Sequence, residues 1–319
     1  MKNKVLLLIM LIANIASTYC QNSENNECSG GWEKYVHNPV LGGDLGTIFD
    51  ISVLKTDKSV YKMYCSWRPK KSIALSESTD GLNWSLPAVC LSFNDSSSWE
   101  KDLNRPVVIQ KDGVYHMWYT GQAEGHSHIG YAVSNDGRNW TRKNADPVLS
   151  PDAPWEKVAV MCPHVIWDEQ KKLFRMWYSG GEQYEPDAIG YATSKDGITW
   201  EKYKGNPVFS NDPKNEWEQA KVTACQVIKR SGDYLMFYIG FKNIDYAQIG
   251  MARSKNGITD WERFKGNPII QPGPGWDSSA VYKPFVIQDN NQWLLFYNGR
   301  RDNHEQIGIA IHKGGKIGF

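Results

Sequence analysis

The sequence has little cysteine and almost no charge excess, and it lacks the short motifs of several enzyme classes. Its six cysteines show no C-x-x-C spacing, which argues against both a zinc site and a dense disulfide framework. The formal net charge is +1 at pH 7, so overall charge gives no reason to expect nucleic acid as a partner. No G-x-S-x-G elbow, phosphate-binding loop or dinucleotide fingerprint is present. The histidines are scattered without ligand spacing, so we expect no metal cofactor, although a structural Ca²⁺ stays open.

The first 20 residues have the pattern of a secretory signal peptide. A basic start at Lys2 and Lys4 precedes an apolar core at residues 5–12 and small residues at 16–18. This apolar run is too short for a membrane span. We therefore expect a secreted or periplasmic protein with no membrane-spanning segment.

Cys20 leaves a lipid-anchored protein as the alternative. Tyr19 just before it is bulky, whereas bacterial lipoprotein cleavage sites normally carry a small residue there, so plain secretion is favoured. Residues 21–30 form a polar tether, and residues 31–319 form one remaining domain.

A segment rich in aromatic residues recurs along the chain. Residues 176–200 read MWYSGGEQYEPDAIGYATSKDGITW, and residues 117–140 read MWYTGQAEGHSHIGYAVSNDGRNW. The isoleucine that anchors each copy recurs at intervals of about 60 residues, at Ile73, Ile129, Ile189, Ile249 and Ile307. Each copy reads as an inner strand, an alternating aromatic strand, an I-G-x-A strand and a fourth strand that begins with Trp. The sequence therefore predicts an all-β, five-bladed β-propeller of four-stranded antiparallel blades.

The two ends of the domain complement each other. Residues 31–41, GWEKYVHNPVL, match the fourth strand at residues 199–209, TWEKYKGNPVF, and the last repeat lacks this strand. We expect the N-terminal strand to complete the last blade, which closes the ring and removes open sheet edges. We also expect a monomer.

Residues that recur in every repeat are interpreted as scaffold, and residues that break the pattern are candidates for function. The acidic residues that follow a Trp recur at Glu100, Glu156, Glu218 and Asp277. Asp50 breaks the pattern: it heads the first inner strand, where the other repeats have Arg105, Cys162, Ala224 and Lys283. Further exceptions are Asp102 at the second inner strand and the loop carboxylates Glu124, Glu182, Glu185 and Glu305.

Basic and aromatic residues gather at the same ends of the strands. The basic residues are Arg68, Lys70, Lys71, Arg105, Lys221, Lys242, Lys283, Arg300 and Arg301, and the aromatic residues are Trp67, Tyr184, Phe241, Tyr246 and Tyr282. The basic residues either pair with the carboxylates or bind an anion such as a uronate, a sulfated sugar or phosphate. The aromatic rings either pack in the fold or stack against a sugar.

The motifs M-W-Y-S-G-G and I-G-Y-A-T-S-K-D-G-x-x-W resemble those of the five-bladed glycoside hydrolases related to family 43, a group that also holds families 32, 130 and 137. The resemblance implies a base Asp at the head of the first inner strand, which matches Asp50. The third inner strand, at 158–167, lacks the second Asp of family 43, and Asp102 is the nearest substitute. An acid Glu is also implied, for which Glu182 or Glu185 is the choice.

We therefore expect a secreted, exo-acting glycoside hydrolase that removes a terminal arabinofuranosyl- or xylosyl-type sugar, or an anionic relative, from a plant or algal polysaccharide. Asp50 is expected as base or nucleophile, Glu182 or Glu185 as acid, and Asp102 as an orienting group. The expected substrate-binding residues are Trp67, Arg68, Arg105, His164, Lys221, Lys283, Arg300 and Arg301. A phosphorylase of the family 130 type and a carbohydrate-binding propeller without catalysis stay open as alternatives.

Overall fold

The computed structural model describes residues 27–56 and 59–319. The predicted signal peptide, Cys20 and most of the tether lie outside the described residues. Within the described ranges no helix is long and apolar enough to cross a membrane.

The described chain is built from strands, with only four short 3₁₀ turns, which confirms the all-β prediction. The turns are η1 (Gly43–Leu45), η2 (Arg68–Lys70), η3 (Pro154–Glu156) and η4 (Glu216–Glu218). The strands are β1 (Trp32–Lys34), β2 (Ile48–Lys55), β3 (Tyr61–Trp67), β4 (Ser72–Ser78), β5 (Ala88–Leu91), β6 (Asp102–Lys111), β7 (Val114–Ala123), β8 (His126–Ser134), β9 (Thr141–Arg142), β10 (Ala159–Asp168), β11 (Leu173–Gly181), β12 (Pro186–Ser194), β13 (Glu201–Lys202), β14 (Phe209–Ser210), β15 (Lys221–Lys229), β16 (Tyr234–Asn243), β17 (Tyr246–Ser254), β18 (Glu262–Arg263), β19 (Ala280–Asp289), β20 (Gln292–Arg301) and β21 (His304–Lys313).

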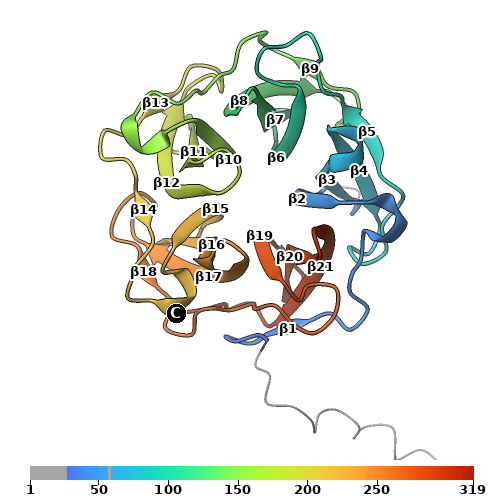
Figure 1. The fold of residues 1–319 in the computed structure, drawn as a ribbon, viewed down its shortest axis with the longest axis vertical. Helices are drawn as coiled ribbons and strands as arrows, with labels where there is room; N and C mark the ends of the chain where they lie inside the picture. The colour runs from blue at the N-terminus through green and yellow to red at the C-terminus, as the bar shows by residue number, and fades with distance from the viewer. Residues whose placement is uncertain (1–26, 57–58) are drawn as a thin grey trace, which may run out of the picture.

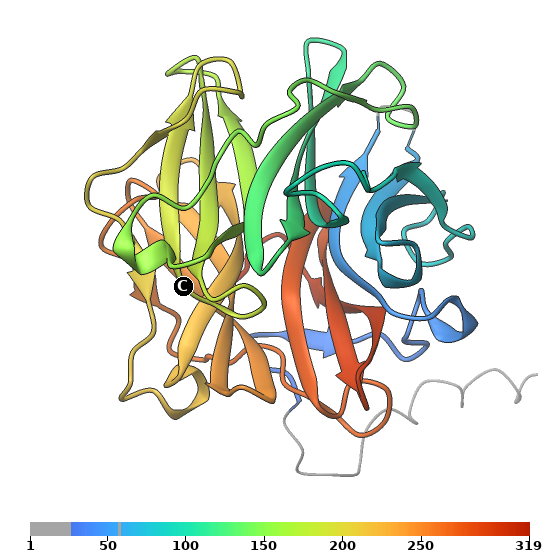
Figure 2. The same cartoon turned by 45° about the horizontal axis from the view of Figure 1, so that its top comes forward.

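The strands pair in chain order into antiparallel groups: β2-β3-β4-β5, β6-β7-β8-β9, β10-β11-β12-β13 and β15-β16-β17-β18. One parallel pair, Ala159 with Ser127, joins the second group to the third. The last group is β19-β20-β21-β1, in which Trp32 of β1 lies opposite His312 of β21. The groups surround a central axis, with β2, β6, β10, β15 and β19 innermost (Figure 1). A turned view shows strands of neighbouring groups standing side by side (Figure 2).

Aromatic residues of the second strands tie each repeat to the next. Trp118 in β7 and Trp177 in β11 are fully buried, and each indole N–H donates to a carbonyl of a tight turn one repeat further along, at Gly197 and Gly257, both 2.8 Å away. Gly197 has φ +79°, and a Cβ there would come within 2.9 Å of the Trp118 ring. These turns therefore belong to the packing between repeats.

The recurring acidic residues also belong to the scaffold. Each accepts a hydrogen bond from a buried tyrosine of the second strand and pairs with a basic residue. The pairs are Glu100 with Tyr119 and Arg142, Glu156 with Tyr178 and Lys202, Glu218 with Tyr238 and Arg263, and Asp277 with Tyr297 and Lys34. Burial beside these carboxylates raises the pKa of the tyrosines well above its ordinary value. The interpretation of these carboxylates as structural is therefore supported by their contacts.

Glu156 provides a test of this network. It has no solvent exposure, and it accepts hydrogen bonds from the Tyr178 hydroxyl and Lys202 Nζ, both at 2.7 Å. Glu156→Gln leaves the ammonium group of Lys202 without its buried partner, so we expect the free energy of unfolding to fall by about 2–4 kcal/mol in urea denaturation. The exposed Glu201→Gln is the matched control, with an expected change below about 0.5 kcal/mol. Equal stability of the two variants would contradict a structural role for Glu156.

Candidate active site

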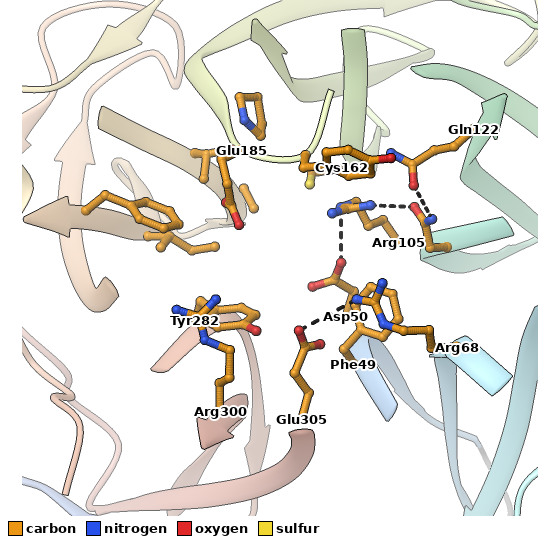
Figure 3. A pocket seen from close by; sticks show the side chains of 17 residues that line it. Phe49, Asp50, Arg68, Arg105, Gln122, Cys162, Glu185, Tyr282, Arg300 and Glu305 are labelled. Atoms are coloured by element: carbon orange, nitrogen blue, oxygen red, sulfur yellow. Dashed lines mark hydrogen bonds and ion pairs between the residues drawn. The ribbon is translucent and has the colours of Figure 1, made fainter. Parts of the chain in front are cut away.

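A pocket of about 250 Å³ opens where the inner strands begin and the loops between second and third strands end (Figure 3). This volume is smaller than that of typical ligand pockets, which enclose about 300–1,000 Å³. Its charged lining residues are Asp50, Arg68, Arg105, Glu185, Arg300 and Glu305.

Each inner strand has a bulge, and four of the five bulge residues, Asp50, Arg105, Cys162 and Ala224, line the pocket. The bulge residues all have left-handed φ values, of 48°, 54°, 52°, 35° and 53°, at Asp50, Arg105, Cys162, Ala224 and Lys283 respectively. The register between first and second strands shifts at the same places. A bulge bends its strand and re-aims a side chain, and left-handed φ values in residues other than Gly are uncommon and cluster at functional sites. These five residues are the ones that occupy equivalent positions when the repeats of this chain are aligned with one another.

Asp50 is held by contacts on two sides. Its Oδ2 lies 3.1 Å from Nε of Arg105, and its Oδ1 accepts a hydrogen bond of 3.1 Å from Asn298. Asn298 also accepts the backbone N–H of Asp50 at 3.0 Å. Arg105 in turn donates to Asn104, which donates to Gln122. Asp50 is 4% exposed, so this network fixes an ion-paired carboxylate at the pocket floor.

Glu185 approaches the pocket from the loop between β11 and β12. Burial raises the pKa of its carboxyl to about 7, and the negative charge of Asp50 adds to this effect. The positive charges of Arg105, Arg300 and Lys221 act in the opposite direction. Lys221 Nζ donates to the backbone carbonyl of Glu185 at 2.7 Å and so holds the loop in place. The pocket therefore contains one carboxyl whose pKa is raised to about 7, so that a large fraction of it is protonated at neutral pH, and one that forms an ion pair.

Glu305 is the third carboxyl in the pocket. It is 8% exposed, and burial raises its pKa against the opposing charge of Arg68, whose Nη2 lies 3.7 Å away. A side-chain hydrogen bond with Tyr282 also acts to lower the pKa of Glu305, whereas the nearby Thr223 hydroxyl is buried and has no hydrogen-bond partner among the described residues. Glu305 and Thr223 both line the pocket. A buried polar atom without a partner is costly, so the Thr223 hydroxyl is suited to bind a hydroxyl group of a ligand.

The structure brings together only some of the residues chosen from the sequence. Asp50, Arg68, Arg105, Glu185 and Arg300 line the pocket. Lys221 and Glu182 line an adjoining hollow instead.

The structure distinguishes Glu185 from Glu182. The Glu182 side chain is 58% exposed and pairs with Lys157 at 2.9 Å. Of the two acid candidates, only Glu185 lines the pocket.

Other residues chosen from the sequence are not in the pocket lining. Asp102 is partly buried, and burial raises its pKa. The Trp67 indole donates to the Leu45 carbonyl at 2.8 Å, and Arg301 pairs with Asp302 at 3.3 Å.

His164 and Lys283 are buried away from the pocket lining as well. His164 lies against the Val227 carbonyl, and burial lowers its pKa to about 4. Lys283 is 4% exposed at the bulge of β19. Binding roles for these residues stay predictions.

Several pocket residues were not chosen as site residues from the sequence. Asn298, Thr223, Asn104, Gln122 and Cys162 line or support the pocket, and Glu305 and Tyr282 were noted only as a loop carboxylate and an aromatic residue. A signal for Asn298 exists in the repeats: the residue before the glycine of the second strand is Thr120 in β7, Ser179 in β11 and Asn298 in β20. Within the described residues no cluster of three His, Cys, Asp or Glu side chains could hold a metal ion.

The comparison with known sequences decides the family. The sequence pattern of Glycosyl hydrolases family 43 matches residues 36–313. The chain belongs to this family. Membership in family 43 implies a saccharide substrate, and the resemblance drawn from the blade motifs is confirmed.

The relatives of this family 43 chain include hydrolases and phosphorylases. An uncharacterized protein of Mycobacterium tuberculosis is 31% identical over 192 residues, which cover 57% of this chain and 60% of that protein. A 1,2-β-oligomannan phosphorylase of Thermoanaerobacter sp. is 28% identical over 223 residues, which cover 65% of this chain and 68% of that enzyme. The match thus spans about 60% of the length of the first of these relatives.

Solved structures share the fold. A thermostable family 43 glycoside hydrolase has a TM-score of 0.69 and 21% identity, over 88% of this chain and 96% of that one. The β-1,2-mannobiose phosphorylase of Listeria innocua has a TM-score of 0.68 and 13% identity, over 88% of this chain and 96% of that one. At these identities the likeness concerns the fold alone.

Proposed function

We propose that the protein is a secreted, exo-acting glycoside hydrolase, built as a five-bladed propeller that β1 closes. It removes a terminal sugar of arabinofuranosyl or xylosyl type, or an anionic relative, from a plant or algal polysaccharide. One observation carries the proposal: Glu185, with a pKa raised to about 7, shares a pocket with the ion-paired carboxylate Asp50. Glycoside hydrolysis needs this combination of a protonated acid and an ionised partner.

In the proposed mechanism Glu185 gives its proton to the oxygen of the scissile glycosidic bond. The bond between the anomeric carbon and that oxygen breaks, and the rest of the polysaccharide leaves as an alcohol. Asp50 either takes a proton from the attacking water or bonds to the anomeric carbon itself, after which water releases the sugar. Asn298 and Arg105 orient Asp50 for either step.

The position of Glu185 favours attack on a terminal sugar. Tyr184 and Glu185 line both the pocket and the adjoining open hollow, which Lys221 and Ile244 also line. A sugar in the pocket and its neighbour in the hollow would place the linking oxygen beside Glu185. The small volume of the pocket leaves room for one residue, which supports exo-action.

The raised pKa of Glu185 gives a pH prediction. The acid is protonated below its pKa and ionised above it, so we expect kcat/KM to fall as pH rises through about 7. The falling limb is absent in Glu185→Gln, because an amide does not ionise in this range. A pH–rate profile on an aryl glycoside with a poor leaving group checks this, and an alkaline limb that persists in the variant would contradict it.

The proposed function is tested by a hydrolysis screen of residues 21–319. The panel contains aryl α- and β-arabinofuranosides, xylosides, galactosides and uronides, each with and without phosphate. Release of sugar without phosphate supports the hydrolase. Turnover only with phosphate favours the alternative, a phosphorylase, which the kinship with the oligomannan phosphorylase motivates. Sugar binding without turnover would identify a carbohydrate-binding propeller.

A further inference from the structure

The arginines of the pocket are unequally paired. Arg105 has its carboxylate partner Asp50 at 3.1 Å, and Arg68 has Glu305 at 3.7 Å. Arg300 has no carboxylate within ion-pair distance among the residues described, and its Nη2 donates to the backbone carbonyl of Asp245 at 2.8 Å. Arg300 therefore carries a positive charge that no neighbouring side chain neutralises by direct contact.

The proposed mechanism increases the excess of positive charge in the pocket. The charged lining residues are three arginines and three carboxyls. Glu185 must be protonated when it acts, so its negative charge is absent at that moment. The reactive pocket then has one more positive than negative charge, in a partly desolvated site where electrostatic interactions are strong.

The geometry leaves the Arg300 guanidinium available to a ligand. The group lies 5.9 Å from the centre of the Tyr282 ring, which limits its motion on one side. Figure 3 shows Arg300 beside Tyr282 and on the same side of the pocket as Glu305. A guanidinium has five N–H donors in a fixed fork, of which Asp245 uses one. The remaining donors match the two oxygens of a carboxylate.

We infer that the terminal sugar bound in the pocket carries a carboxylate, so that the substrate is a uronide, and that Arg300 binds this carboxylate. This inference rests on the proposed function and names its substrate class. A neutral sugar would offer the Arg300 guanidinium no negatively charged partner, and a site built around a polar group discriminates against ligands that lack its partner. Free phosphate has the same oxyanion chemistry, and the experiment below separates the two sources.

The test uses aryl glycosides that differ only at C5. Glucuronide, glucoside and xyloside carry a carboxylate, a hydroxymethyl group and a hydrogen there, and galacturonide, galactoside and L-arabinopyranoside form the matching series. We expect kcat/KM for one uronide to exceed that of both neutral counterparts by at least about 10-fold, since a charge-assisted hydrogen bond contributes about 1.5–3 kcal/mol. Arg300→Met should reduce this preference to within about threefold, because it removes the group that binds the carboxylate, which only the uronide carries.

Arg138→Met is the matched control, because Arg138 is 59% exposed and pairs with Glu77 outside the pocket. This control should keep the preference for the uronide. Equal loss of activity on all three sugars in Arg300→Met, or a preference of the unmodified protein for a neutral sugar, would overturn the inference. Turnover that requires inorganic phosphate, with a raised KM for phosphate in Arg300→Met, would overturn it as well.

A binding measurement separates failure of the inference from failure of the proposed function. Calorimetry with glucuronate and galacturonate is compared with calorimetry on glucose and galactose. Selective uronate binding that Arg300→Met abolishes supports the inference even if no substrate is hydrolysed. Hydrolysis of neutral glycosides without any uronate selectivity would retain the proposed function and refute the inference.

Discussion

Asp50→Asn is expected to lower kcat by at least about 10³-fold on every substrate, whatever the leaving group. Asparagine has nearly the same shape as aspartate and tolerates the left-handed backbone at this position, where φ is 48°. It lacks the negative charge that attacks the anomeric carbon or accepts a proton from water. Initial rates on an activated aryl glycoside and on the polysaccharide measure the effect.

The control for this prediction is another carboxylate on the protein surface. Glu216→Gln removes a carboxylate that is 76% exposed and pairs with Lys242, and it should retain at least about half of the activity. Because Asp50→Asn leaves Arg105 without its partner, thermal unfolding must show that the variant is folded at the assay temperature. A folded Asp50→Asn protein with more than a tenth of the original rate would rule out a catalytic role for Asp50.

Glu185→Gln is expected to slow hydrolysis by about 10²–10⁴-fold when the leaving group is another sugar. An alkoxide is a poor leaving group and needs a proton from the acid. A dinitrophenolate leaves without protonation, so the variant should hydrolyse a dinitrophenyl glycoside at a rate within about tenfold of the original. The ratio of the two rates, measured on matched substrates, is the readout. Equal loss on both substrates would contradict the assignment of Glu185 as the acid.

The same variant is expected to be more stable at high pH. Since burial raises the pKa of Glu185 from 4.5 to about 7, its contribution to stability is present below about 4.5 and is lost as pH rises through about 7. Glutamine has no charge to bury, so Glu185→Gln should unfold at a higher temperature than the original protein at pH 8 and show little of this gain at pH 4. Thermal scans at the two pH values test the assignment independently of activity.

The repeat pattern made much of the scaffold predictable. Aligned inner strands identified Asp50 and Arg105 as structurally equivalent residues, and both occur at left-handed bulges that line the pocket. The recurrence of Glu156 and its equivalents likewise indicated a structural role, because a binding residue has no reason to appear in every repeat. Periodicity identifies what the repeats share, and it therefore also exposes the residues that differ.

The loop between β11 and β12 could not be interpreted in the same way. Glu182 and Glu185 lie three positions apart in one loop, and the repeat pattern gives no reason to prefer either of them. Only the path of the backbone, held by Lys221 at the Glu185 carbonyl, determines which carboxyl enters the pocket. Partners of charged side chains were equally inaccessible from the sequence, since Arg105 and Arg301 look alike there but pair with Asp50 and Asp302 respectively.

The residues at the bulges of the inner strands also make the pocket chemically asymmetric around the central axis. Their backbones are alike, so what differs around the axis is the side chain at each bulge: the neighbouring repeats with Asp50 and Arg105 contribute charge, and those with Cys162 and Ala224 contribute small uncharged groups. A sugar ring carries hydroxyl groups around its edges and C–H groups on its faces, so the charged and the uncharged parts of this floor are suited to different parts of the ring. Inner strands with nearly the same backbone thus give a chemically asymmetric pocket through single residues, without any change in the strands that hold them.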